Sequence, residues 1–270
     1  MNTFKKTTLA LAVFTLASGA IAQTAPAPAP APAASPITAN ITITNDYRYR
    51  GISQSNFLPA IQGGFDYAHE SGFYIGNWNS SISWLSDQNS GSSAPIEMDF
   101  YGGYKKELIG PGFVTDIGVL QYYYPTTNYT LLNPNTTEIY AAQNFTFGAL
   151  TGFIKVNYSV TTIFGFANST GSYYPDLTLN YDTGLWGITA NGHVGYQYMA
   201  GNQSGSTVSN NSILSYTDWK FGLTKDFGGG LSAAIAYVGT NAKDAGYMQT
   251  VASPKNTGKS AGLISLTKTF

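Results

Sequence analysis

Apolar and polar residues alternate with a period of two along most of this chain. In the segment 38–50, Ile41 and Ile43 share one face, and Thr42 and Thr44 share the other. A β-strand points successive side chains to opposite sides, so the pattern predicts strands with one apolar and one polar face. Beyond the N-terminal region, no segment has the run of about 18 apolar residues that a membrane-spanning helix needs.

The same alternation recurs at regular intervals and predicts twelve strands. They lie near residues 38–50, 59–69, 72–84, 95–106, 113–124, 136–147, 151–162, 173–181, 185–199, 213–226, 231–240 and 260–270. Several of these segments reach the roughly 9–11 residues with which a tilted strand crosses a bilayer. Two are irregular, because Asp116 and Gln143 fall on faces that also carry apolar residues. A β-bulge or a position at the lipid headgroups would each explain such a residue.

The connections between these strands alternate in length. Short links lie at 69–72, 107–112, 147–150, 181–184 and 226–230, and long polar links at 51–58, 85–94, 125–135, 163–172, 200–211 and 241–259. Outer-membrane barrels have short periplasmic turns and long extracellular loops. We therefore predict an all-β fold, a transmembrane antiparallel up-and-down β-barrel of about twelve strands over residues 38–270, in the outer membrane of a Gram-negative bacterium.

Aromatic residues recur near the ends of the predicted strands, where rings favour the membrane–water interface. We assign Tyr47, Tyr49, Tyr67, Trp84, Tyr104, Tyr124, Phe147, Trp186, Tyr216 and Phe227 to such aromatic girdles. The chain ends on an alternating strand with a terminal Phe270, the form of signal that the barrel-assembly machinery binds. Lys268 departs from that form, and its long side chain can reach the interface from a strand end.

The N-terminal 37 residues have a different character from the rest. Lys5 and Lys6 precede an apolar stretch that ends at Ala20-Ile21-Ala22, which predicts a signal peptide over residues 1–22. Alanine and proline alternate from Ala25 to Pro36. Proline favours an extended conformation there, so we interpret residues 23–37 as a periplasmic tail.

The composition excludes several kinds of function. Charged residues make up only 10% of the chain and cysteine is absent, so no disulfide framework or thiolate metal site is expected. The net charge of −1 argues against a nucleic-acid partner. No phosphate-binding loop or metal-binding motif is present, and we predict no cofactor and no metal.

If lipid covers the apolar face of each strand, the polar face lines the interior of the barrel. The predicted pore-lining residues are Asp46, Arg48, Arg50, Asp66, Glu97, Asp99, Tyr101, Lys105, Lys155, His193, Asp218 and Lys220. Opposed acids and bases in a confined column of water would orient polar solutes and select ions. We also predict that Arg48 pairs with Asp66 on the neighbouring strand. A purely structural ladder of ion pairs is the alternative.

Several segments together resemble the proteobacterial TorF family of porins. They are Asn45–Gln54, Gly72–Trp78, Glu97–Tyr104, Asp116–Gly118 with Tyr123–Pro125, and Thr217–Lys220. The resemblance spans nearly the whole chain after the Ala-Pro segment. It implies an outer-membrane porin of unassigned substrate and supplies no catalytic residues.

These patterns predict a porin-like channel for passive diffusion of small polar or charged solutes, in contact with outer-membrane lipid and lipopolysaccharide. A closed structural or adhesive barrel that acts through its loops is the first alternative. The second is a lipid hydrolase, which needs a serine beside a histidine. Only His69, in a short turn, and His193, on an inward face, are available. Whether the barrels form a homo-oligomer is left open.

Overall fold

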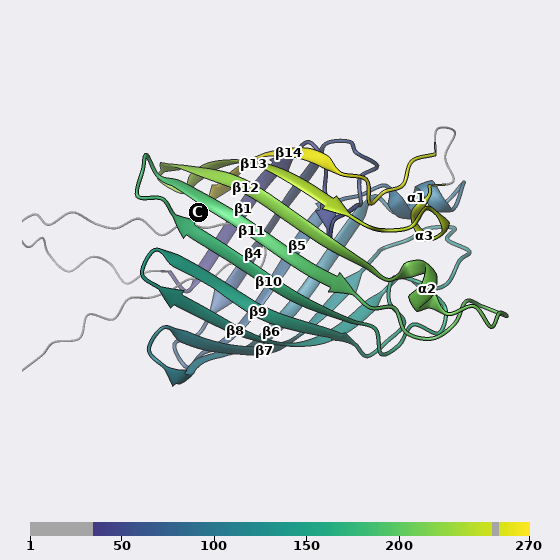
Figure 1. Cartoon of the computed structure of the whole chain (residues 1–270), viewed down its shortest axis with the longest axis horizontal. Coiled ribbons are helices and arrows are strands. Elements are labelled where there is room, and N and C mark those ends of the chain that lie inside the picture. The colour runs from purple at the N-terminus through teal and green to yellow at the C-terminus, as the bar shows by residue number, and fades with distance from the viewer. Residues whose placement is uncertain (1–34, 250–253) are drawn as a thin grey trace, which may run out of the picture.

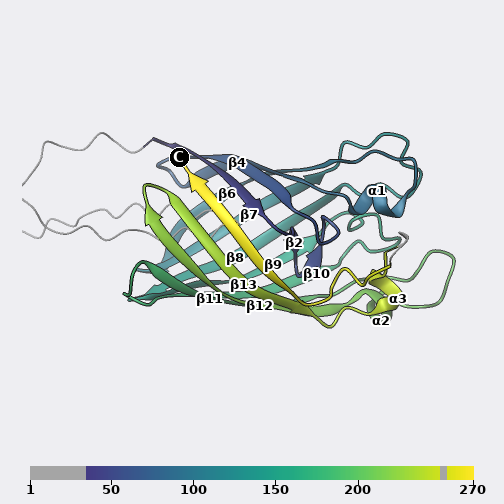
Figure 2. The same cartoon turned by 90° about the horizontal axis from the view of Figure 1, so that it is seen from above.

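Twelve antiparallel strands close into a barrel in the computed structural model, which describes residues 35–249 and 254–270 (Figures 1 and 2). The wall strands are β1 Ile37–Thr44, β4 Ala60–Ala68, β5 Phe73–Ser81, β6 Ile96–Gly110, β7 Phe113–Tyr123, β8 Thr136–Phe147, β9 Leu150–Ser159, β10 Tyr173–Asp182, β11 Ile188–Gln197, β12 Tyr216–Gly228, β13 Leu231–Thr240 and β14 Ala261–Thr269. Strand β1 pairs with β4 on one side and with β14 on the other, which closes the ring. The predicted fold class is confirmed.

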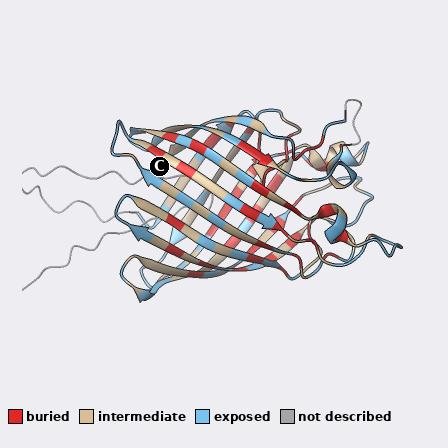
Figure 3. Ribbon diagram, in the orientation of Figure 1, coloured by how far each residue is buried: buried red, intermediate tan, exposed pale blue. Residues whose placement is uncertain are grey.

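The predicted division into an apolar outer face and a polar inner face is also present. On β1, Ile41 and Ile43 are exposed, whereas Thr42 and Thr44 are buried. The same alternation of burial follows the other wall strands (Figure 3). A water-soluble surface does not carry a continuous band of exposed isoleucine, leucine and phenylalanine, so this outer surface requires a hydrocarbon environment.

The two ends of the barrel differ as the link lengths predict. Tight turns join the strands at the end where Phe270 lies, and the long loops gather at the opposite end (Figure 1). Three short helices interrupt those loops: α1 Trp84–Gln88, α2 Asn210–Leu214 and α3 Asp244–Tyr247. No helix of the described residues is long and apolar enough to cross a membrane.

Several predicted strand boundaries are wrong. The segment 38–50 is not one strand, because β1 ends at Thr44 and the chain then leaves the wall. The segment 72–84 ends early, since Trp84 begins α1 instead of finishing β5. Strand β6 continues to Gly110, and a register shift between Glu107 and Gly110 absorbs the extra residues. The predicted signal peptide lies outside the described residues.

The aromatic girdles are only partly those predicted. Tyr67, Phe147, Trp186 and Phe227 are exposed near the tight turns, whereas Tyr47, Tyr124 and Tyr216 are buried inside the molecule. The exposed rings near the long loops belong to other residues: Tyr123, Tyr158, Tyr173, Tyr196 and Trp219. The girdle at the loop end therefore comes from residues at or near the ends of β7, β9, β10, β11 and β12.

The irregular strands have a simple explanation. Asp116 points inward with buried Leu120 and Tyr122, so this face of β7 lines the interior despite its apolar members. Gln143 points outward, where its Oε1 accepts a hydrogen bond of 2.9 Å from the hydroxyl of Thr115 on the facing strand. The polar group on the outer face is thus paired, which lowers the cost of placing it against lipid.

Replacing Ile235 by arginine tests the contact between the barrel and lipid. Ile235 lies in the middle of β13 and is 57% exposed on the outer face. We expect the substitution to lower the free energy of unfolding in a bilayer by about 2–4 kcal/mol, as for charges near the midplane of other barrels. Leu231→Arg is the matched control, because it lies on the same face at the tight-turn end and should cost about 0–1 kcal/mol. Equal losses in urea titrations of both variants would contradict the assignment.

Candidate pore

After β1, the chain turns away from the wall at Asn45. The side chain of Asn45 donates to the carbonyl of Gly262 at 3.1 Å and accepts from the amide of Ile264 at 2.8 Å. These bonds satisfy backbone groups of β14 at the point where the pairing with β1 ends. Residues 45–59, here called the inserted hairpin, then enter the barrel at its loop end before β4 begins.

The tip of the inserted hairpin is a tight turn between β2 Arg48–Tyr49 and β3 Ile52–Ser53. Tyr49 pairs with Ile52, so Arg50 and Gly51 form a two-residue loop. Both have positive φ, 46° and 77°, as the central residues of a type I′ turn require. These two strands form a separate sheet that is not hydrogen-bonded into the barrel ladder.

Arg50 fixes the hairpin across the interior of the barrel. Its guanidinium forms an ion pair of 2.7 Å with Glu138 on β8 and donates a hydrogen bond of 2.7 Å to Gln197 on β11. The same group lies over the ring of Tyr174 on β10, 4.2 Å from its centroid. The side chains of Arg50 and Glu138 are only 6% and 0% exposed. One residue of the hairpin therefore joins three wall strands.

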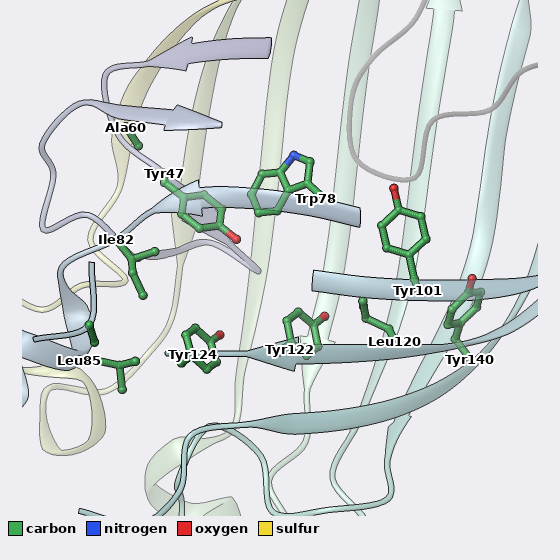
Figure 4. Close-up of a cluster of buried hydrophobic side chains, with 11 residues drawn as sticks. Tyr47, Ala60, Trp78, Ile82, Leu85, Tyr101, Leu120, Tyr122, Tyr124 and Tyr140 are labelled. Atoms are coloured by element: carbon green, nitrogen blue, oxygen red, sulfur yellow. The ribbon is translucent and has the colours of Figure 1, made fainter. Parts of the chain in front are cut away.

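Tyrosines attach the other side of the hairpin to β5, β6 and β7. The hydroxyls of Tyr49 and Tyr122 lie 2.6 Å apart. Tyr47 and Tyr124 both donate to the buried carboxyl group of Glu97, at 2.5 and 2.8 Å. Tyr47 also packs edge-on against Trp78, and Figure 4 shows these rings turned toward the interior of the barrel. The hairpin thus rests on an aromatic wall.

Below the hairpin, toward the tight turns, the wall carries a belt of charged groups. His193 lies between two carboxylates, with its Nε2 2.8 Å from Asp218 and its Nδ1 3.0 Å from Asp176. Carboxylates only accept hydrogen bonds, so both ring nitrogens donate and the imidazole is charged in this arrangement. Across the belt, Lys105 pairs with Asp116 at 3.6 Å. The belt therefore presents both signs of charge to the lumen.

The free volume in the lumen lies on the side away from the tyrosines. A cavity of about 100 Å³ is lined by residues of β1 and β11–β14, and most of them are small. Ala234, Ala236 and Ser265 are among them, and Lys220 reaches in from β12. Small side chains on one wall and large rings on the other leave an off-centre space for water.

The structure places the twelve predicted pore-lining residues in two groups. Asp66, Glu97, Asp99, Tyr101, Lys105, Lys155, His193, Asp218 and Lys220 lie on the wall strands, and Asp46, Arg48 and Arg50 lie on the inserted hairpin. The prediction of the last three as wall residues is wrong, because the chain leaves the barrel at Asn45. The predicted pair of Arg48 with Asp66 is wrong too. Arg48 binds Asp46 at 2.6 Å, and Asp66 accepts from Tyr101.

Neither histidine forms the site that a lipid hydrolase would need. His69 contacts Ser71 at 2.7 Å, but this is an exposed contact within one tight turn. The partners of His193 are Asp176, Asp218, Tyr174 and Thr178, with no serine among them. The hydrolase alternative thus gains no support from the geometry.

A family model described as "Bacterial protein of unknown function (Gcw_chp)" matches residues 29–270. The chain belongs to the Gcw_chp family. No curated protein sequence matches it significantly. The region of this Gcw_chp protein that the family model matches includes the inserted hairpin and every wall strand.

The Gcw_chp barrel is similar in fold to solved porins and channels, at low sequence identity. The KdgM porin in complex with disordered oligogalacturonate has a TM-score of 0.51 at 9% identity, covering 87% of this chain and 98% of that one. An outer-membrane channel from Pseudomonas putida F1 has a TM-score of 0.51 at 11% identity, covering 88% and 96%. The NanC porin has a TM-score of 0.50 at 9% identity, covering 86% and 97%.

Sequence reasoning missed three acidic residues of the Gcw_chp lumen, Asp116, Glu138 and Asp176. Glu138 lies two residues from Thr136 and Tyr140, all of which are buried on the inner face of β8. The period-two rule applied to this strand would have found it. Asp176 pairs with His193 and likewise follows the inward alternation of β10.

Proposed function

We propose that this protein is an outer-membrane channel through which small polar or charged solutes diffuse passively, and that the inserted hairpin is its constriction. The observation that carries the proposal is the combination of a charged inner wall with a hairpin that is not part of the barrel sheet. A barrel built only as a scaffold has no need of ionisable groups beneath an inserted segment. The similarity in fold to porins supports the same function.

The belt of charges gives the channel a means of selecting solutes. Both signs of charge lie side by side around the wall: Lys105 pairs with Asp116, and Lys155 is the register partner of Asp176 on the adjacent strand. A field across a narrow column of water orients dipolar solutes and filters ions. We expect zwitterionic and dipolar solutes to pass more readily than apolar solutes of equal size.

The proposal includes the cellular setting that the sequence predicts. The N-terminal 22 residues would direct export, and β14 with Phe270 would be the strand that the assembly machinery binds. Lys268 reaches the carbonyl of Gly229 at the tight-turn end, in keeping with a position at the periplasmic interface, while lipopolysaccharide would contact the loop end of the barrel. The TorF resemblance fits this function, and association into a homo-oligomer would leave each pore intact.

A liposome-swelling assay on the folded full chain tests the channel. Permeation of glycine or glucose, with exclusion of a large oligosaccharide, is the expected result. Ion conductance in planar bilayers provides an independent measurement on the same preparation. An absence of both swelling and conductance in the wild type and in hairpin variants would rule the channel out.

One observation favours a closed structural or adhesive barrel: the inserted hairpin fills the loop end of the lumen. Such a barrel would remain impermeable when the hairpin is loosened, since nothing in its function would depend on an aqueous path. The hairpin variants described below therefore separate the two functions.

A further inference from the structure

A second cavity lies above the inserted hairpin, at the mouth of the barrel. Its volume is about 90 Å³. Tyr49 and Ile52 of the hairpin line it, together with Trp84 of α1 and Tyr247 of α3. In Figure 2, α1 and α3 stand on opposite sides of the loop end, so the cavity lies across the entrance. A solute that enters from the loop side meets this cavity before the constriction.

None of the described residues that line the cavity is an aspartate, glutamate, lysine, arginine or histidine. This is unusual for the molecule, since the lumen below the hairpin is rich in such residues. Its lining includes aromatic rings, among them Trp84, Phe164 and Tyr216, aliphatic and methionine side chains, and four glutamines: Gln54, Gln88, Gln197 and Gln249. Arg50 is not among the lining residues; its guanidinium forms the ion pair with Glu138 and donates to Gln197, one of the lining glutamines.

Two buried polar atoms in residues lining this cavity have no hydrogen-bond partner among the described residues. They are Nε1 of Trp84, which can only donate, and Oε1 of Gln249, which can only accept. Buried polar groups are nearly always hydrogen-bonded in folded proteins. Both atoms are closed off from solvent, so a ligand with hydroxyl groups would reach them through a rotation of each side chain, and a hydroxyl both donates and accepts.

The geometry points to a binding site for a neutral sugar in this cavity. Aromatic faces pack against the apolar C–H faces of a sugar ring, while the indole N–H and the amides bind its hydroxyls. A sugar acid would find no cation among the lining side chains, and burying its charge unpaired is costly. The volume of about 90 Å³ is several times the roughly 10–15 Å³ that holds one water, so the cavity has room for a ligand larger than water.

The competing occupant is a quaternary ammonium ion, for which the rings would form an aromatic cage. Rings alone would suit such a cation. The N–H of Trp84, however, can only donate, and the glutamines offer a cation no full negative charge. A neutral polyol, which offers several hydroxyl groups and carries no charge, therefore suits the lining better than choline.

The inference rests on the proposed function, since it names the class of solute that the channel would capture at its entrance. Isothermal calorimetry on the full chain in detergent tests binding separately from transport. Maltose, glucose and lactose are the probes for neutral sugars. Glucuronate, glucosamine and choline are the charged comparators, and benzyl alcohol is the apolar one. At least one neutral sugar should bind more tightly than any comparator.

Trp84→Phe keeps an aromatic ring and removes the N–H. It should weaken binding of that sugar about fivefold, the effect of losing one neutral hydrogen bond. Trp219→Phe is the matched control, because Trp219 lies on the outer face of β12, away from the cavity. Its affinity should equal that of the wild type. Both variants are first checked for the folded barrel by their gel mobility before and after heating.

Three results would overturn the sugar site: no binding of any neutral sugar, unchanged affinity in the folded Trp84→Phe variant, or tighter binding of choline, a charged sugar or benzyl alcohol. Each would leave the channel intact if the liposomes still swell. If the barrel binds a sugar but causes no liposome swelling and conducts no ions, the proposed channel function is wrong and the sugar site is supported.

Discussion

Arg50→Ala is expected to increase the single-channel conductance strongly. The substitution leaves Glu138 as a buried carboxylate without its cation, and losing one partner of a buried ion pair costs about 3–5 kcal/mol. The seated hairpin, in which residue 50 lies against the wall strands, is destabilised by this amount. The ratio of unseated to seated hairpin should therefore rise roughly a hundredfold to a few thousandfold. Planar-bilayer recordings would show longer openings and a higher mean current.

The control for Arg50→Ala replaces both partners. Arg50→Met with Glu138→Gln removes both charges while keeping similar volumes, and the new amide can still accept from Asn157 as Glu138 does at 2.9 Å. Neutral replacements of a buried pair are often tolerated, so conductance should return toward the wild-type level. Equal conductance in the wild type and Arg50→Ala would show that the hairpin does not limit the pore.

Gly51→Val is expected to open the pore through sterics alone. Gly51 has a φ of 77°, which β-branched residues strongly avoid. A Cβ at this position would lie 2.7 Å from Cβ of Asp218 and would also collide with the methyl group of Thr240. Backbone strain and overpacking each cost about 1–3 kcal/mol, and the overpacking disappears when the turn leaves the wall. Conductance should rise while the barrel remains folded.

Gly205→Val separates backbone strain from steric collision as the cause of a change in conductance. Gly205 also has a positive φ, 65°, but a Cβ there would meet no atom within 4 Å. It lies in the long loop between β11 and β12. This variant carries comparable strain without the collision, so its conductance should match the wild type. A similar rise in both glycine variants would assign the effect to general loosening of the barrel.

The barrel was predictable from sequence because lipid imposes one rule on every wall strand. Ile41 and Ile43 must face hydrocarbon, and Thr42 and Thr44 must face water, so period two reveals the strand. The inserted hairpin follows the same period, since β2 and β3 are also extended. Tyr47 and Tyr49 therefore look like outer-face residues in the sequence, although their rings pack inside.

The contacts of the hairpin could not be predicted from the sequence, and the reason is different. Arg50 meets Glu138 and Gln197, which lie 88 and 147 residues away along the chain. Alternation tells which face a residue occupies, not which distant residue it meets across the lumen. Asn45 and Gly51 were the available signals for a break and a tight turn. They are weak beside the unbroken alternation of 38–50.

Because of where the arginines lie, their accessibility reports whether the inserted hairpin is inside the barrel. Arg48 and Arg50 are the only arginines in the chain, and both lie on the inserted hairpin, where their side chains are nearly inaccessible. An arginine-specific protease added to whole bacteria can therefore cleave this chain only when that segment swings outward. The yield of two defined fragments would measure, in living cells and without any label, how often the entrance is clear.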